Sequence, residues 1–170
     1  MRLSLPFGRT MSYRMEFEKV LKYCEGEVGL NIGCGNTGIK NSFGVDMDPE
    51  KKGCVIVANA WQLPIADNSI DYIVSMACIE HLDRSLQTVL KEWRRVLKTG
   101  GRCIVTTPEG SVTKNDWVLA QCSDHLNLFT LPQLTLHFEV AGFEIEVAEE
   151  IDRMPESPHP TIIVVGKKNG

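Results

Sequence analysis

The sequence predicts an α/β domain built on a mostly parallel sheet with an antiparallel last strand. Residues 70–107 follow the order strand, amphipathic helix, strand, which is typical of a parallel crossover. Residues 143–166 hold two strand-like segments with no helix between them, so these should pair antiparallel. A chain of 170 residues is long enough for one core, and we expect a single domain over 1–170.

The first elements are a helix and a strand. Residues 13–24 place apolar side chains on one helical face, inside an N-terminal helical segment that we assign to 1–26. Residues 28–32 form a short apolar strand that runs into a glycine-rich stretch. Residues 54–60 are apolar at first, as expected of a strand that is buried on both faces.

The glycine-rich stretch has the spacing of a nucleotide loop but lacks room for a helix. Gly33, Gly35 and Gly38 fit the pattern G-x-G-x-x-G, which usually turns a strand into a helix beneath a nucleotide. Residues 39–43 alone separate Gly38 from the next strand, which ends at Asp46. A parallel crossover normally takes about a dozen residues or more, so we expect the first crossover helix to be reduced or absent.

The clearest helix lies between the strands at 70–78 and 102–107. Asp83 can cap its start. Leucine, valine and tryptophan then recur at helical spacing as far as Leu97, and the pair Gly100–Gly101 can end the helix.

The C-terminal part changes from crossover to hairpin-like order. Thr130 can cap a helix that Gly142 ends. Residues 143–151 alternate apolar and acidic side chains, and residues 161–166 form the last strand. The segment 108–130 is the only substantial insertion that we expect on the substrate side of the sheet.

Composition excludes several classes of protein. A net charge of −4 and a pI near 5.6 argue against a broad nucleic-acid surface, although a small local contact with RNA stays open. The six cysteines form no C-x-x-C pair, so we predict no metal site of the zinc type. No apolar run reaches the roughly 18 residues of a membrane span, and no signal peptide is recognisable. We therefore expect a cytoplasmic protein with reduced thiols.

Three residues suggest a ligand site at the carboxyl ends of the first two strands. Gly33 and Gly35 follow the first strand and allow backbone N–H groups to approach a ligand. Asp46 ends the second strand beside them, where a carboxylate can accept hydrogen bonds from ribose hydroxyls. Asp48, which precedes Pro49, is better explained as a helix cap. Removal of Asp46 is accordingly expected to leave the unliganded chain almost as stable as before.

A wider pattern resembles a known family. The run from 58 to 108 is similar to the class I S-adenosylmethionine-dependent methyltransferases, and most of all to a small type-11-like group with a shortened first crossover. The matching signatures are Leu63-Pro64-Ile65, Asp67-Asn68-Ser69-Ile70-Asp71, Glu80-His81-Leu82 and Arg95-Val96-Leu97-Lys98-Thr99-Gly100-Gly101. The resemblance extends over roughly residues 13–150. It implies a Rossmann-like, seven-stranded sheet in which the last strand is antiparallel.

The resemblance also implies S-adenosylmethionine as the cofactor and a set of residues around it. Asp46 would hold the ribose, Met47 would pack on the adenine, and Asn59 and Ala60 would face the adenine edge. Trp61 would cover the ring, although a core position is nearly as compatible with its place in the sequence. The complete set of expected cofactor residues is Asn31, Gly33, Cys34, Gly35, Asp46, Met47, Asn59, Ala60, Trp61 and Met76.

Two positions depart from the family pattern. Asn31 stands where the first motif has Asp or Glu, and Asn59 stands where Asp is usual. An amide oxygen accepts hydrogen bonds but lacks the charge that favours a sulfonium ligand. Together with the missing helix, these departures leave open a cofactor-binding subunit or sensor that transfers no methyl group.

Two histidines are the candidates for catalysis. His81 follows the fourth strand, and His125 lies on the loop after the fifth, where acceptors sit in this fold. A purely structural role fits each of them as well. The predicted function is methyl transfer from S-adenosylmethionine to an unidentified acceptor, which is large or presented by a partner protein because the chain carries no long lid. A nicotinamide-dependent reductase would explain the glycines alone.

Overall fold

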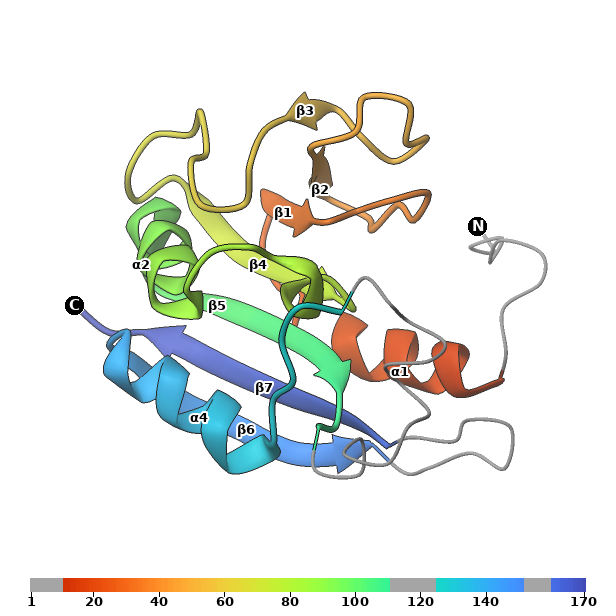
Figure 1. Ribbon diagram of the computed structural model, residues 1–170. Coiled ribbons are helices and arrows are strands. Elements are labelled where there is room, and N and C mark those ends of the chain that lie inside the picture. Colours follow the sequence, from red (N-terminus) through yellow and green to blue (C-terminus); the bar gives the residue numbers. More distant parts are fainter. Residues whose placement is uncertain (1–10, 111–124, 152–159) are drawn as a thin grey trace.

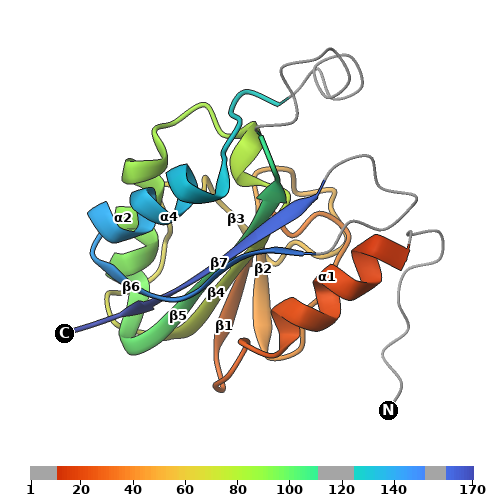
Figure 2. The same ribbon diagram turned by 90° about the horizontal axis from the view of Figure 1, so that it is seen from below.

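The structure, a computed structural model, describes residues 11–110, 125–151 and 160–170. This part of the chain contains seven strands, three α-helices and one short 3-10 helix (Figure 1). The strands form a sheet, with two of the α-helices on one side of it and the third on the other (Figure 2). In chain order the elements are α1 (Met11–Leu21), β1 (Gly29–Ile32), β2 (Ser42–Asp46), β3 (Ile56–Val57), β4 (Ile70–Met76), η1 (Ile79–His81), α2 (Leu86–Val96), β5 (Leu97–Pro108), α4 (Leu131–Val140), β6 (Phe143–Ile151) and β7 (Thr161–Lys168).

The strands form one sheet in the order β3-β2-β1-β4-β5-β7-β6. The five strands from β3 to β5 are parallel, and β7 runs antiparallel to both β5 and β6. Helix α1 lies on one face of the sheet, and α2 and α4 lie on the other (Figure 2). The predicted fold class, including the antiparallel end, is confirmed.

Each face of the sheet has its own core. On the face of α2 and α4, the buried side chains of Trp93, Leu134 and Phe138 pack against the strands. On the opposite face, Phe17 and Val20 of α1 pack against the central strands. Burying both faces explains why the central strands are almost continuously apolar.

The crossover from β1 to β2 contains no helix, as the short spacing predicts. Residues 33–41 form a loop that lies against the α1 face, where Ile39 is buried in the core. Two side chains of the sheet hold this loop from below. The amide of Asn31 donates to the carbonyl of Thr37 at 2.8 Å, and the hydroxyl of Tyr72 donates to the carbonyl of Lys40 at 2.7 Å.

The strand expected over 54–60 is much shorter than predicted. Only Ile56 and Val57 pair with β2, at one edge of the sheet. Val55 and Val57 are exposed, so their apolar character does not reflect burial in the sheet. A very short edge strand limits pairing with other chains.

Helix α2 begins later and ends earlier than the sequence suggests. Its N-cap is Ser85, whose side chain accepts from Thr88 N, so the prediction of Asp83 as the cap is wrong. The helix ends at Val96, and Leu97 already starts β5. Gly100, with φ of 84°, lies in an irregular stretch at the start of β5, where the pairing with β4 shifts register.

The C-terminal helix follows the prediction closely. Thr130 and Gln133 form a reciprocal capping box at the start of α4. Gly142 follows the helix with φ of 88°, a conformation that glycine adopts without strain. Residues 111–124 of the predicted substrate-side insertion lie outside the described residues, and so do residues 152–159. The segment after Asp48 forms a turn, so the predicted helix there is absent from the described chain.

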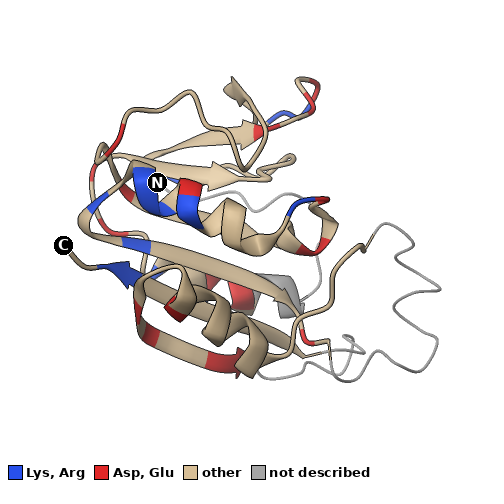
Figure 3. Ribbon diagram, turned by 60° about the vertical axis from the view of Figure 1, so that its left-hand side comes forward, with Lys and Arg blue, Asp and Glu red and all other residues tan. Residues whose placement is uncertain are grey.

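Charged residues of both signs are distributed over the surface. Acidic residues lie along β6, the strand at one edge of the sheet, and basic residues lie on α2 and at the end of β7 (Figure 3). Within the described residues, no helix is long and apolar enough to cross a membrane.

Candidate functional site

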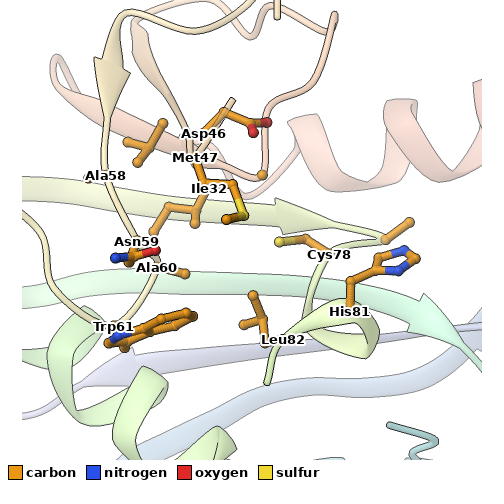
Figure 4. A pocket seen from close by; sticks show the side chains of 13 residues that line it. Ile32, Asp46, Met47, Ala58, Asn59, Ala60, Trp61, Cys78, His81 and Leu82 are labelled. Carbon is orange, nitrogen blue, oxygen red and sulfur yellow. The ribbon is translucent and has the colours of Figure 1, made fainter. Parts of the chain in front are cut away.

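A pocket opens at the carboxyl ends of β1, β2 and β4, the place where ligands bind in parallel α/β sheets. The empty space within it is about 700 Å³, counting the part that is open to solvent. Figure 4 shows Asn59 and Trp61 on one side of it and His81 on the other. The lining residues are Ile32, Gly33, Val45, Asp46, Met47, Ala58, Asn59, Ala60, Trp61, Ala77, Cys78, His81 and Leu82.

The glycines of the loop are not equivalent. Gly33 has φ of 68°, and a Cβ there would lie 2.3 Å from the sulfur of Cys78, so only glycine fits. Gly35 has φ of 50° but faces open space. Gly38 has neither a positive φ nor a close neighbour, and its place in the motif has no structural requirement.

Asp46 ends β2 at the pocket and also holds the loop. Its Oδ2 accepts from Gly35 N at 2.9 Å, and its Oδ1 accepts from Asp48 N at 3.0 Å. Each carboxylate oxygen can accept a further bond, so the group can bind a ligand while it keeps these two. It is the only acid among the described lining residues. These two bonds predict that Asp46 contributes to the stability of the unliganded fold, which differs from the expectation drawn from the sequence.

The pocket segment at residues 59–61 is positioned by α2. The buried indole of Trp93 donates to the carbonyl of Ala60 at 2.8 Å, which fixes the backbone of that residue. The side chain of Asn59 is exposed at the pocket. The Trp61 ring also lines the pocket, and the guanidinium of Arg84 lies 5.1 Å from its centroid. A cation over an indole restricts how the ring can turn.

Arg95 ties the loop after this segment to α2. Its guanidinium donates to the carbonyls of Leu63 and Ile65 and to the carboxylates of Asp67 and Glu92. Glu92 in turn accepts from the backbone N–H of Leu63 at 2.7 Å. The planar fork of arginine suits several acceptors at once. This network explains why the loop and the helix carry their signature residues together.

Four of the expected cofactor residues are absent from the described lining. Asn31 is buried beneath the loop and donates to Thr37, a bond that a carboxylate could not form. Cys34 is buried, and desolvation, with the charge of Asp46, raises the pKa of its thiol to about 11. Gly35 contacts Asp46 just outside the pocket. Met76 packs into the core on the α1 side.

The turn after β4 supplies lining residues that the sequence did not single out. Ala77 has φ of 47°, a strained conformation for a residue with a Cβ, and such strain concentrates at functional sites. Burial raises the pKa of the Cys78 thiol to about 12, so it is protonated at neutral pH and is a poor nucleophile. Only the position of the turn at a strand end could have indicated these residues.

The two candidate histidines lie next to each other. The ring of His81 lines the pocket, and the ring of His125 packs edge-on against it, with 4.7 Å between the centroids. Glu80 is buried behind them, and burial raises the pKa of its carboxyl group. The sequence indicated both histidines but gave no reason to include Glu80.

Comparison with known proteins finds a family match over part of the chain. Residues 30–105 match the methyltransferase domain family. The chain is 27% identical over 151 residues to a protein of Mycolicibacterium smegmatis named as an S-adenosylmethionine-dependent methyltransferase, over 79% of this chain and 58% of that protein. It is 29% identical over 106 residues to a protein of Methanocaldococcus jannaschii without assigned function, over 62% of this chain and 43% of that protein. The chain thus spans about half the length of the curated relatives it matches.

Solved structures share the fold. A chain from the complex of the Haloferax volcanii Trm112 methyltransferase activator with a methyltransferase has a TM-score of 0.77 and 19% identity, over 94% of this chain and 92% of that chain. An S-adenosylmethionine-dependent methyltransferase of Thermotoga maritima has a TM-score of 0.73 and 20% identity, over 94% and 92%. The chain thus resembles the S-adenosylmethionine-dependent methyltransferases in sequence over residues 30–105, and it shares the fold of these solved structures, with its pocket at the strand ends.

Proposed function

We propose that this protein binds S-adenosylmethionine in the pocket and transfers its methyl group to an acceptor. The observation that carries the proposal is the position of Asp46, which ends β2 at the pocket mouth beside Gly33 and the loop. Its carboxylate would accept from the ribose hydroxyls. Met47 would pack on the adenine, with Asn59 and the backbone of Ala60 at its edge.

The remaining expected residues would contact other parts of the cofactor or support the residues that do. Trp61 would close over the adenine ring, and Gly33 and Gly35 would offer backbone N–H groups to the methionine part. Asn31 and Cys34 would support the loop from below, and Met76 would support the turn after β4.

The chemistry needs little from the protein besides position. A lone pair of the acceptor attacks the methyl carbon, the carbon–sulfur bond breaks, and its electron pair stays on sulfur to give S-adenosylhomocysteine. If the acceptor atom carries a proton, that proton leaves to a base or to water. Holding the two reacting atoms in line lowers the activation barrier, because their translational and rotational entropy is already lost on binding. His81 and His125 are the candidates for contact with the acceptor.

Calorimetric titration with S-adenosylmethionine, S-adenosylhomocysteine and NAD tests the binding step. We expect both sulfur ligands to bind and NAD not to bind. Failure of both sulfur ligands to bind would refute the proposal. A turnover assay with labelled methyl donor over small molecules and proteins then tests transfer. Binding without any turnover would favour the non-catalytic subunit or sensor.

A partner protein is part of the proposal. One structural neighbour comes from a complex with a methyltransferase activator, and this chain exposes Phe43, Val55 and Val57 at the β3 edge of its sheet. Apolar side chains at a sheet edge suit a protein surface. We propose that a partner protein presents or completes the acceptor site. Recovery of full turnover by the isolated chain would contradict this part.

A further inference from the structure

Three side chains that can each ligate a metal ion meet beside the pocket. Glu80 and His81 come from the η1 turn after β4, and His125 comes from the segment that leads into α4. One potential ligand atom from each of them lies within 4.8 Å of the others. These residues are far apart in the sequence, so the fold is what brings them together.

Backbone hydrogen bonds fix this meeting point. The N–H groups of Leu126 and Asn127 both donate to the carbonyl of Glu80, at 2.7 and 2.9 Å. The side-chain amide of Asn127 donates to the carbonyl of Leu82 at 2.7 Å. The residue before this pair is His125, so its place relative to the η1 turn is set by the three bonds. The cluster is a built arrangement rather than an approach of mobile surface groups.

The carboxylate of Glu80 is placed to receive a cation. Its side chain is only 2% exposed, and Oε2 accepts from the hydroxyl of Thr107 at 3.0 Å. Oε1 is buried, and within the described part of the chain it has no hydrogen-bond partner. A buried carboxylate needs a positive partner or a proton, because burial without either is costly.

We propose that Glu80, His81 and His125 bind one divalent first-row transition-metal ion of the zinc class. Two imidazole nitrogens with one carboxylate oxygen suit zinc, iron, cobalt or nickel, whereas magnesium and calcium prefer oxygen ligands alone. Ligand atoms at about 2.0–2.2 Å from such an ion lie closer together than 4.8 Å, so binding would draw the three groups inward by small side-chain rotations. Three protein ligands leave at least one coordination position open.

The location suggests what the open position would hold. His81 is both a member of the cluster and a lining residue of the pocket, so the ion would lie where pocket and cluster meet. This step rests on the proposed function: the ion would bind an oxygen atom of the acceptor and lower the pKa of its hydroxyl group. The deprotonated oxygen would then attack the methyl carbon, with its proton released to water. The metal site itself does not depend on this step.

Titration with Co²⁺ and Zn²⁺ tests the site. Protein freed of metal with a chelator is titrated with Co²⁺ and followed by visible absorption, and Zn²⁺ is then used to displace it. We expect one ion per chain with nitrogen and oxygen ligation and no thiolate-to-cobalt band. His125→Ala and the isosteric Glu80→Gln should each lower the affinity by at least about tenfold, the effect typical of losing a ligand or its support.

Matched variants separate the site from other metal-binding groups. His137→Gln removes a histidine of α4 that contacts Gln87 and Phe129 and lies outside the cluster, and it should leave the affinity unchanged. Cys78→Ala removes the thiol of the pocket and should also leave it unchanged. Equal affinity of His125→Ala and the parent, or no metal binding by a folded parent, would overturn the proposal. Titration of the same samples with S-adenosylmethionine reports the proposed function separately, since that ligand can bind whether or not the metal does.

Discussion

Asp46 combines two tasks at one residue. It accepts from the backbone N–H groups of Gly35 and Asp48, and it presents the only carboxylate among the described lining residues of the pocket. The sequence places this acid correctly at the end of its strand. It cannot show the two backbone bonds, because these depend on how the loop folds back over the strand.

Replacing Asp46 should therefore affect both stability and binding. Asp46→Ala removes the acceptor of two backbone N–H groups, each worth about 0.5–1.5 kcal/mol, so we expect the free energy of unfolding to fall by about 1–3 kcal/mol. Binding of S-adenosylmethionine should weaken by well over tenfold, where each factor of ten in affinity corresponds to about 1.4 kcal/mol. Urea unfolding and calorimetry measure the two effects. Asp48→Ala is the control: the side chain of Asp48 bonds to Glu50 N–H and Lys51 of its own turn, and the backbone N–H that donates to Asp46 is kept, so binding should stay normal.

Asn59 offers a test of the adenine side. Its side chain is exposed at the pocket, so Asn59→Asp should keep the fold. The carboxylate accepts more strongly than the amide from an adenine amino group, and cofactor affinity should be equal or higher. Calorimetric titration of the parent and the variant with S-adenosylmethionine measures this difference in affinity. A loss of about tenfold or more in affinity would mean that Asn59 donates a hydrogen bond or lies away from the adenine.

Among the elements, α2 holds the backbone of residues 60–65 in place without lining the pocket. Arg95 binds the carbonyls of Leu63 and Ile65, and Trp93 binds that of Ala60. The helix was predictable from its apolar spacing, but its caps were not. Ser85 and Asp83 are both good N-cap residues, and only the tertiary position of the chain selects Ser85.

Arg95→Lys should weaken cofactor binding from a distance. Lysine keeps the charge but loses the planar fork, so the carbonyls of Leu63 and Ile65 lose donors and the loop loosens. We expect a several-fold loss of affinity, corresponding to about 1 kcal/mol. Arg94→Lys is the matched control on the same helix, because Arg94 binds the carbonyls of Gly142 and Asn169 instead. Similar losses in both variants would argue against the role of this loop.

The start of β4 carries a pH-dependent contribution to stability. Lys98, then the N–H groups of Val28 and Glu27, hold the pKa of Asp71 below its ordinary value. A lowered pKa stabilises the fold above the unfolded-state pKa of about 3.9, and this part is lost as pH falls through the folded-state value. Asp71→Asn should therefore show a smaller decline of unfolding free energy on acidification below about pH 4. Parallel pH profiles of parent and variant would disprove this.

At the scale of the whole molecule, the mostly parallel sheet and its antiparallel end followed from the pattern of strands and helices, whereas the order of the strands comes from the structure. The apolar runs of the central strands are long because both faces are buried, and this made them visible in the sequence. The edge strand β3 was harder to predict. Val55 and Val57 have the same apolar character as core residues but are exposed, so the pattern over 54–60 suggested a longer strand than the two residues that pair. The Glu80–His81–His125 cluster was also hidden, since no local pattern joins it.

The loop that replaces the first crossover helix has a consequence for the order of folding. Gly29 pairs with Ser42 and Ile32 with Val45, so this parallel strand pair closes over a short stretch of chain, unlike most parallel pairs. Closing a short loop costs less entropy, and local contacts favour early formation. We expect Ile32→Val and Val45→Ala to slow folding, with φ-values of about 0.5 or more, whereas Ile163→Val in β7 should mainly speed unfolding. Stopped-flow kinetics in urea would show the difference, and equal φ-values in both regions would mean that the shortened crossover gives this end of the sheet no lead in folding.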